Sequence, residues 1–571
     1  MHRGRGDELE KPNNDAGLRA GSGIIAGLWA ALAAIGAAAF AVEIPFFFQG
    51  MPSGHDVEFH LNSWLEVLAQ WKEGIYFPRW ASWAHFGYGE PRFIFYPPAS
   101  WTVCAILTAI LPWGIVASVY IWISLTLAGT SMFLLVRRWF NPRDAIFAGV
   151  LYAVNPYHLV IVYWRSAFAE LLASCLVPVL LLLVLKIAEG EKRVTIPLAL
   201  VLAAAWLTNA PAAVMIHYSL ALLLVIFAWQ KQSLRILVVG VAAVALGACL
   251  AAFYLIPAIY EQRWIDIAKA ISLGGRPAVN FLFAHTADAP HDQFNRIISW
   301  VAVFEMTILF LTAAAAKLRG KINRESWSVM LIWAIACSLM MFPVTALAWR
   351  FLPKLAFMQF PWRWMLCLSM IFTVFVTAGT AATGTLSVST ESAGRRSWGM
   401  RAAIFLAGIM LMVASWHFIQ EPWWDNAADL RELQDNITDH IGYEGTEEYT
   451  PAGANPSLTD KNAANVSVAG QGQAVISVSR WSAEQKLFTA EVSAPTQLAL
   501  RLFSYPAWKA EVNGREVQTR SGPAGQIIVP VEPGVNQVQI MFVRTWDRTL
   551  GGWISVIAAV CAGAWRVFRR A

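Results

Sequence analysis

The chain alternates between long apolar segments and short polar connections for most of its length. A segment of about 20 apolar residues is long enough to cross a bilayer as a helix. Two of the segments are interrupted, one at Leu111–Gly114 and the other at Thr208–Pro211. By length, we expect about 12 to 13 membrane-spanning helices. The apolar segments are Ile24–Ile44, Ala99–Val136, Ala145–Val162, Phe168–Ile187, Val194–Trp229, Leu234–Ile256, Ile297–Ala316, Trp327–Ala348, Trp362–Thr383, Ala402–Ile419 and Leu550–Val567.

Positive charge between these segments predicts their sidedness, because connections rich in Lys and Arg stay in the cytoplasm. The clusters can all be cytoplasmic if Val194–Trp229 is a hairpin and Ala99–Val136 makes one net crossing. They are Arg137, Arg138 and Arg143; Lys186, Lys192 and Arg193; Lys231 and Arg235; Lys317, Arg319, Lys321 and Arg324; Arg395, Arg396 and Arg401; and Arg566, Arg569 and Arg570. The extracytoplasmic side then receives the first loop, Tyr163–Glu170, Tyr260–Asn295, Arg350–Pro361 and Glu421–Arg548.

A change of pattern near the C-terminus predicts a second domain. From Ala474 onward, short runs alternate apolar and polar residues, and turn residues such as Asn513-Gly514 separate them. This pattern is typical of a small antiparallel β-sandwich. We therefore expect a polytopic α-helical membrane protein with an extracytoplasmic β-domain before its last helix. The predicted parts are a cytoplasmic polar tail (1–23), a transmembrane domain (24–419) with its first extracytoplasmic loop at 45–98, a β-rich domain (420–548), and a last helix with a basic tail (549–571).

Composition supports a membrane protein and excludes several classes of function. The chain is 57% hydrophobic and only 14% charged, whereas an ordinary globular chain has about 25% charged residues. The net charge of +6 lies mostly in short connections, which indicates topology rather than nucleic-acid binding. The six cysteines lie in apolar runs without CxxC spacing, so the sequence predicts neither a disulfide framework nor a zinc site.

The stretch Gly54–Trp101 in the first loop is the strongest candidate for a functional site, because it is rich in aromatic and ionisable residues. Its first part predicts an amphipathic helix in the outer membrane interface. The apolar face holds Val57, Leu61, Trp64, Leu65, Leu68 and Trp71, and the polar face Glu58, Asn62, Glu66 and Glu73. Asp56 occupies the N-terminal end, where it is either a helix cap or an exposed carboxylate above the bundle.

Several motifs resemble a known class of membrane enzymes. An acidic residue just after the first membrane helix, followed by an interfacial helix and Gly74-Ile75-Tyr76-Phe77-Pro78-Arg79-Trp80, is similar to the GT-C class of polyprenyl-phosphate-sugar glycosyltransferases. Phe86-Gly87-Tyr88-Gly89-Glu90-Pro91 resembles more narrowly a bacterial branch labelled as 6-pyruvoyl-tetrahydropterin synthase-related. We give that label no chemical weight, because the sequence has no convincing zinc-binding His triad. Further matches to the branch are Phe95–Pro98, Tyr163–Ala173, Phe253–Pro257 before Glu261, Gln359–Arg363, Glu447–Pro451 and Tyr505–Trp508.

The resemblance implies roles for individual residues. Asp56 takes the position of the general base that accepts a proton from the acceptor, and Glu58 would share the site. The other candidates would bind substrate or phosphate; they are Arg165, Glu170, Arg363, Arg79, His60 and Asn209. Several have a structural alternative: an Arg can snorkel to the interface, Glu58 can lie on a solvated helix face, His60 can be a hydrogen-bonded interfacial residue, and Asn209 can satisfy the backbone freed by the broken helix.

The need for a metal is left open by the resemblance. Oligosaccharide-transferring members hold a divalent metal on acidic residues of the outer loops, which here would be Asp56, Glu58 and Glu170. Members that use simple lipid-phosphate sugars need none. We therefore assign no metal and leave the cofactor unknown.

Together these patterns predict a glycosyltransferase of the bacterial inner membrane. It would transfer a sugar from a polyprenyl-phosphate-linked donor to a glycan, lipid or protein on the extracytoplasmic face. The alternatives are a non-enzymatic transporter or flippase of lipid-linked glycan, for which broken helices without a clear repeat are weak support, and an inactive GT-C-like scaffold in cell-envelope assembly. For the enzyme, we expect Asp56, Arg165, Glu170 and Arg363 to line one cavity that opens laterally to lipid.

Overall fold

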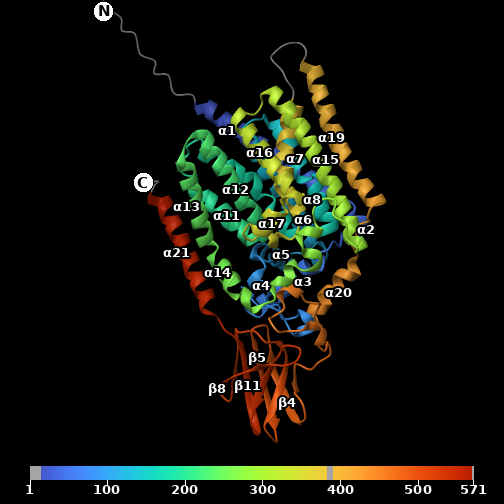
Figure 1. Ribbon diagram of the computed structural model, residues 1–571, viewed down its shortest axis with the longest axis vertical. Helices are drawn as coiled ribbons and strands as arrows, with labels where there is room; N and C mark the ends of the chain where they lie inside the picture. Colours follow the sequence, from blue (N-terminus) through green and yellow to red (C-terminus); the bar gives the residue numbers. More distant parts are fainter. Residues whose placement is uncertain (1–13, 382–389, 569–571) are drawn as a thin grey trace, which may run out of the picture.

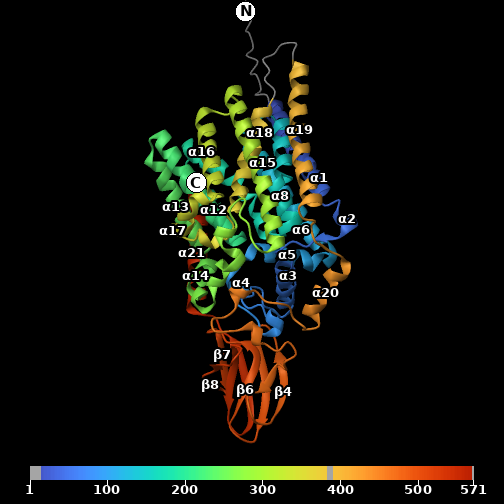
Figure 2. The ribbon, with the colours of Figure 1, turned by 45° about the vertical axis from the view of Figure 1, so that its right-hand side comes forward.

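The computed structural model describes residues 14–381 and 390–568. A helical bundle forms most of the molecule, and a β-domain extends from one end of it (Figures 1 and 2). We call this end of the bundle the β-end and the opposite end the far end. Residues 1–13 of the predicted polar tail and residues 569–571 of the predicted basic tail lie outside the described part, as does the end of the predicted segment Trp362–Thr383.

Nine helical segments of the described part are long and apolar enough to cross a membrane. Two bent pairs of helices raise this number to up to 11 if each pair is one span. The described part also has two apolar helices that are shorter, α5 (Pro98–Ile110) and α11 (Thr195–Thr208). The predicted number of about 12 to 13 is reached only when these short helices are also counted. The nine segments contain α1 (Asn14–Val42) with α2 (Phe46–Gln49), α6 (Trp113–Val136), α7 (Pro142–Ala153) with α8 (Pro156–Val160), α9 (Phe168–Ala173) with α10 (Leu176–Ala188), α12 (Ala210–Lys231), α15 (Ala289–Arg319), α18 (Met365–Thr380), α19 (Thr390–Phe418) and α21 (Trp546–Phe568).

The two bent pairs lie next to connections that reach the β-end. In one, α13 (Leu234–Leu250) meets α14 (Ala252–Glu261) and the following turn at 76°. In the other, α16 (Arg324–Met340) meets the segment that contains α17 (Ala346–Phe351) at 90°. Such breaks are tolerated in a membrane only where the freed backbone groups are buried in protein or face a polar cavity.

The predicted sidedness requires one net crossing in Ala99–Val136 and a hairpin in Val194–Trp229, and the helices agree with both conditions. The 13 residues of α5 extend about 20 Å at 1.5 Å per residue, which is too short for a hydrocarbon core of about 30 Å. Ala99–Val136 therefore fits one net crossing. Helices α11 and α12 pack against each other and are joined only by Asn209, whose backbone is extended, so they form the predicted hairpin.

The first loop folds as predicted but is more deeply covered. Its helix is α3 (Val57–Lys72), and α4 (Arg92–Phe95) follows it. The predicted polar face of α3 is not exposed along its whole length, because Asn62 and Glu66 are buried. The chain after α20 (Ala427–Thr438) covers this face, and the Tyr443 hydroxyl donates to Glu66 Oε2 at 2.6 Å.

The β-domain is an antiparallel sandwich of two sheets, as the alternation predicts. A four-stranded sheet has the order β3-β6-β10-β9, and a five-stranded sheet has the order β4-β5-β11-β7-β8. The strands are β3 (Val466–Val468), β4 (Ala474–Trp481), β5 (Gln485–Val492), β6 (Thr496–Phe503), β7 (Trp508–Val512), β8 (Arg515–Val517), β9 (Arg520–Ser521), β10 (Gln526–Val531) and β11 (Gly534–Phe542). A separate short pair, β1 (Met51–Pro52) and β2 (Trp424–Asp425), ties the first loop to the chain after α19.

Two contacts hold the β-domain on the bundle. Trp80 of the first loop is fully buried and packs edge-on against Trp508 of β7, with ring centroids 5.6 Å apart. At the base of α21, Arg548 donates two hydrogen bonds to the carboxylate of Glu261 (2.7 and 2.8 Å), and the Tyr505 hydroxyl adds a third at 2.6 Å. These contacts fix the β-domain relative to the loop that carries Asp56.

Candidate functional site

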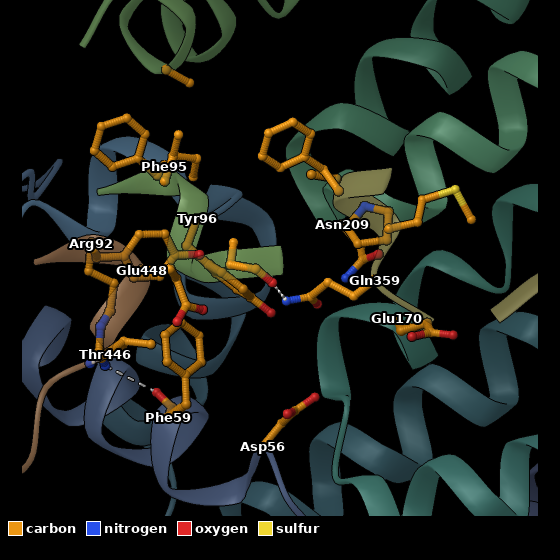
Figure 3. A pocket seen from close by; sticks show the side chains of 18 of the residues that line it. Asp56, Phe59, Arg92, Phe95, Tyr96, Glu170, Asn209, Gln359, Thr446 and Glu448 are labelled. Carbon is orange, nitrogen blue, oxygen red and sulfur yellow. Dashed lines mark hydrogen bonds between the residues drawn. The ribbon is translucent and has the colours of Figure 1, made fainter. Parts of the chain in front are cut away.

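A cavity of about 900 Å³ lies at the β-end of the bundle (Figure 3). Its walls come from α3, the segment around α4, the start of α9, the α11–α12 break, α13 and α14, the segment 354–363, and the chain at 443–449. One side is rich in ionisable groups, and the side toward α13 is apolar. Lining residues include Asp56, Glu58, His60, Arg92, Tyr96, Glu170, Asn209, His217, Val244, Tyr254, Lys354, Gln359, Arg363, Thr446, Glu448 and Tyr449.

Asp56 lies at the N-terminus of α3, but its side chain makes no capping hydrogen bond. Instead, Arg165 Nη2 donates to Asp56 Oδ2 at 2.8 Å, and 38% of the Asp56 side chain stays exposed. The backbone sets this position, because Asp56 N donates to Arg165 O at 2.9 Å. At Gly54 an added Cβ would lie 2.5 Å from the Arg165 carbonyl carbon, so only glycine allows the two turns to approach this closely.

Glu170 joins the two predicted arginines. Its Oε2 accepts from Arg165 Nη1 (3.5 Å) and Arg363 Nε (3.2 Å), while the Tyr157 hydroxyl donates to the other oxygen. Arg165 also lies 4.8 Å above the ring of Trp362. We call Asp56, Arg165, Glu170 and Arg363 the acidic–basic chain; both arginines are nearly fully buried. Asp56, Glu170 and Arg363 line the cavity, whereas Arg165 lies behind them and connects the two carboxylates.

The charges of this chain keep Asp56 ionised. Burial disfavours the carboxylate, but the positive charges of Arg165 and Arg363 outweigh it and lower the pKa of Asp56 below its usual value. His60 is buried among aromatic rings, 5.2 Å from the ring of Phe168. Burial lowers the pKa of His60 to about 4 against the attraction of Asp56, so its imidazole is neutral at physiological pH.

The remaining predicted residues divide between the cavity and its surroundings. Glu58 is exposed on the first turn of α3 and lines the cavity. Asn209 also lines it, and its Oδ1 caps α12 by accepting from Ala212 N at 2.9 Å. Arg79 is not among the lining residues; it lies over the ring of Phe77 and donates to Phe253 O at 3.4 Å. The structure therefore separates Arg79 from the other candidates.

The comparisons with known proteins identify the family. Residues 93–420, more than half of the chain, match the family described as "6-pyruvoyl-tetrahydropterin synthase related domain; membrane protein". The chain belongs to this family. No curated protein matches the sequence.

Two solved structures resemble this family member at low identity. They are crystal structures of the Archaeoglobus fulgidus oligosaccharyltransferase, in the apo form (TM-score 0.44) and tethered to an acceptor peptide containing the NVT sequon (TM-score 0.42). Each is 14% identical and covers 74% of this chain. The chain spans 60% of the length of those structures.

Metal ligands do not gather in the described part of this family member. Within residues 14–381 and 390–568, no group of three or more His, Cys, Asp or Glu side chains could hold a metal ion. Asp56, Glu58 and Glu170 thus do not form the oxygen site considered above. The Glu170 oxygens are instead occupied by Arg165, Arg363 and Tyr157.

One cavity residue of this family member was missed by the sequence reasoning. Glu448 comes from the chain between α20 and the β-domain and lines the cavity with Asp56 (Figure 3). Burial and, after it, the charge of Glu90 raise the pKa of Glu448. The motif Glu447–Pro451 contained the signal, but two adjacent glutamates do not indicate which one faces inward.

Proposed function

We propose that this protein is a membrane glycosyltransferase that moves a sugar from a polyprenyl-phosphate-linked donor to a glycan, lipid or protein acceptor. The observation that carries the proposal is the acidic–basic chain: an ionised, partly exposed Asp56 beside two buried arginines at the wall of a large cavity. A carboxylate and a guanidinium at one site fit a reaction in which a proton leaves the acceptor and a phosphate leaves the sugar.

In the proposed reaction, Asp56 acts as general base. Its free Oδ1 accepts the proton of the acceptor while the acceptor oxygen or nitrogen bonds to the anomeric carbon of the sugar. The bond from that carbon to the phosphate oxygen breaks, and polyprenyl phosphate leaves with the electron pair. Its phosphate would be bound by Arg363 and by Lys354, which lies on the exposed rim of the cavity. The proton on Asp56 then passes to water.

An apolar groove supports a lipid-linked donor. It has a volume of about 240 Å³, runs along α12 and α13, and shares His217 and Val244 with the main cavity. Gly240 lines the groove, and a Cβ there would lie 2.1 Å from Leu224 Cδ1, so a larger residue would have to displace that side chain. A prenyl chain in this groove would place its phosphate at the polar side of the cavity.

We propose the β-end as the extracytoplasmic side of a bacterial inner membrane, because the cationic connections occupy the other ends of the spans. A donor would then enter from the outer leaflet.

The test is Asp56→Asn in the full-length protein in lipid nanodiscs, given a polyprenyl-phosphate hexose with a labelled sugar and a membrane extract as acceptor. We expect the release of polyprenyl phosphate to fall by about 100-fold or more. Asp439→Asn, at the exposed C-terminal end of α20, is the matched control and should leave the rate unchanged. A wild-type rate in Asp56→Asn contradicts the role of Asp56. Movement of intact donor between leaflets without release of polyprenyl phosphate would instead indicate a flippase.

A further inference from the structure

The chain at 443–449 forms a rigid wall of the cavity. Thr446 N donates to Glu90 Oε2 at 2.8 Å, and Arg92 Nη2 donates to Thr446 Oγ1 at 3.0 Å. Glu90 and Arg92 are themselves paired at 2.6 Å and are almost completely buried. These bonds anchor the backbone of the wall at Thr446 to a buried ion pair.

Glu448 is the partly covered acidic side chain of this wall and has no such structural partner, whereas Glu444 and Glu447 are exposed. Glu66 and Glu90 each accept hydrogen bonds from several groups, but no other described residue donates to the Glu448 carboxyl group. Its position is partly covered, and Asp56 is one of the negative charges that act on it. Apart from a bond from its own backbone N–H, the carboxyl group therefore keeps the capacity to accept hydrogen bonds from a ligand in the cavity.

Aromatic side chains from this wall, from α3 and from the segment around α4 also line the cavity. Tyr449 stacks on Phe95 with ring centroids 6.1 Å apart and an interplanar angle of 5°. Phe59 contacts Tyr96 at 4.7 Å, and all four residues line the cavity. An apolar surface next to one carboxyl group suits a ligand with a flat C–H face and hydroxyl groups at its edge.

We propose that Glu448 and the neighbouring aromatic residues form a sugar-binding subsite, in which the Glu448 carboxyl group accepts hydrogen bonds from ring hydroxyl groups of the donor or acceptor sugar. This inference rests on the proposed function and deepens it, since it assigns the side of the cavity where the sugar lies. The sugar would lie against 443–449, with its anomeric carbon toward Asp56 and the donor phosphate toward Arg363.

Glu448→Gln tests the subsite, because it keeps the size of the side chain and removes the charge. The matched control is Glu447→Gln, an adjacent exposed residue that does not line the cavity. Binding of polyprenyl-phosphate hexose and of polyprenyl phosphate without sugar is measured on the full-length protein in nanodiscs. For a donor subsite, we expect Glu448→Gln to weaken binding of the sugar-bearing lipid by about 10- to 100-fold and to leave the bare lipid unaffected. For an acceptor subsite, the KM for acceptor rises instead, with kcat less affected.

The inference is overturned if Glu448→Gln changes neither donor binding nor the acceptor KM, or if Glu447→Gln has the same effect. Glu448→Asp, which keeps the charge, should retain part of the affinity and serves as the second variant if the first is poorly folded. Binding without transfer separates the two proposals. A wild-type protein that binds the sugar-bearing lipid through Glu448 but transfers nothing contradicts the proposed function and supports the subsite.

Discussion

Two buried arginine–carboxylate clusters at the β-end have similar chemistry but different surroundings. In the cluster at the base of α21, Glu261 is fully buried and Arg548 is 4% exposed, and their two hydrogen bonds form a closed, bidentate pair. In the acidic–basic chain, Arg165 is equally buried, but its partner Asp56 keeps 38% of its side chain exposed to a cavity. Both carboxylate oxygens of Glu261 accept hydrogen bonds inside the protein, whereas Asp56 Oδ1 accepts none from the residues that the structure describes.

The difference separates structural from functional charge. A buried pair that is complete in itself has no group left for a ligand, and it joins α14 to α21 next to the β-domain. A chain with a free carboxylate oxygen at a cavity wall can bind or react. The two clusters cannot be told apart by burial and charge alone. Exposure of a carboxylate to the cavity is what marks one of them as a candidate functional site.

The most direct test of this difference removes one negative charge from each cluster and compares the loss of stability. We expect Glu261→Gln to destabilise the protein by about 3 to 5 kcal/mol, because it leaves Arg548 buried without a counter-charge. Asp56→Asn should cost less than about 1 kcal/mol, because that side chain is partly solvated and Arg165 keeps Glu170. Thermal unfolding in detergent, followed by tryptophan fluorescence, measures both.

The double variant Glu261→Gln, Arg548→Met is the control for this prediction. It removes both charges and should recover much of the lost stability. Equal melting temperatures for Glu261→Gln and Asp56→Asn would mean that the two clusters do not differ as described.

A pH titration tests the acidic–basic chain separately through His60, which contacts this chain and not the Glu261–Arg548 pair. The pKa of His60 is lowered from 6.5 to about 4 in the folded protein, so the unfolded chain binds the proton first as pH falls. The contribution of His60 to the free energy of unfolding is therefore fully present above about pH 6.5. It declines toward pH 4, by roughly 3 kcal/mol in total. In His60→Gln this part of the decline should disappear. Unfolding measured at a series of pH values checks it, and an unchanged slope in the variant would contradict the burial of a neutral imidazole.

Much of the fold could be predicted because it depends on local patterns. Apolar length predicts the spans, and two-residue alternation predicts the β-sandwich. The Thr208–Pro211 break predicts the α11–α12 hairpin, since Asn and Pro interrupt a helix at a defined place. Asp56, Glu170 and Arg363 could be grouped because positive charge places their three connections at one end of the bundle.

The parts that could not be predicted depend on contacts between distant segments. Glu66 has the spacing of a solvated residue on α3, but Tyr443, in the chain between α20 and the β-domain, covers it. Arg79 belongs to a motif shared with the candidate family, yet the loop directs it toward Phe253 instead of the cavity. Nothing in the neighbouring sequence of either residue encodes the segment that it meets. Roles inferred from a motif therefore needed the contacts that the folded chain makes between distant segments.

Asn209, another residue that lines the cavity, provides the test with the smallest expected effect. Asn323 is its matched control, because both are helix N-caps, with Asn323 Oδ1 accepting from Ser326 N at 2.8 Å, but only Asn209 lines the cavity. Substitution of either by Ala should cost about 1 kcal/mol of stability through the lost cap. If the Asn209 amide also donates to substrate, Asn209→Ala alone should raise the donor KM by about 5-fold, the equivalent of one neutral hydrogen bond. Steady-state kinetics of the two variants at a temperature where both stay folded separate these effects, and equal KM values would limit Asn209 to capping α12.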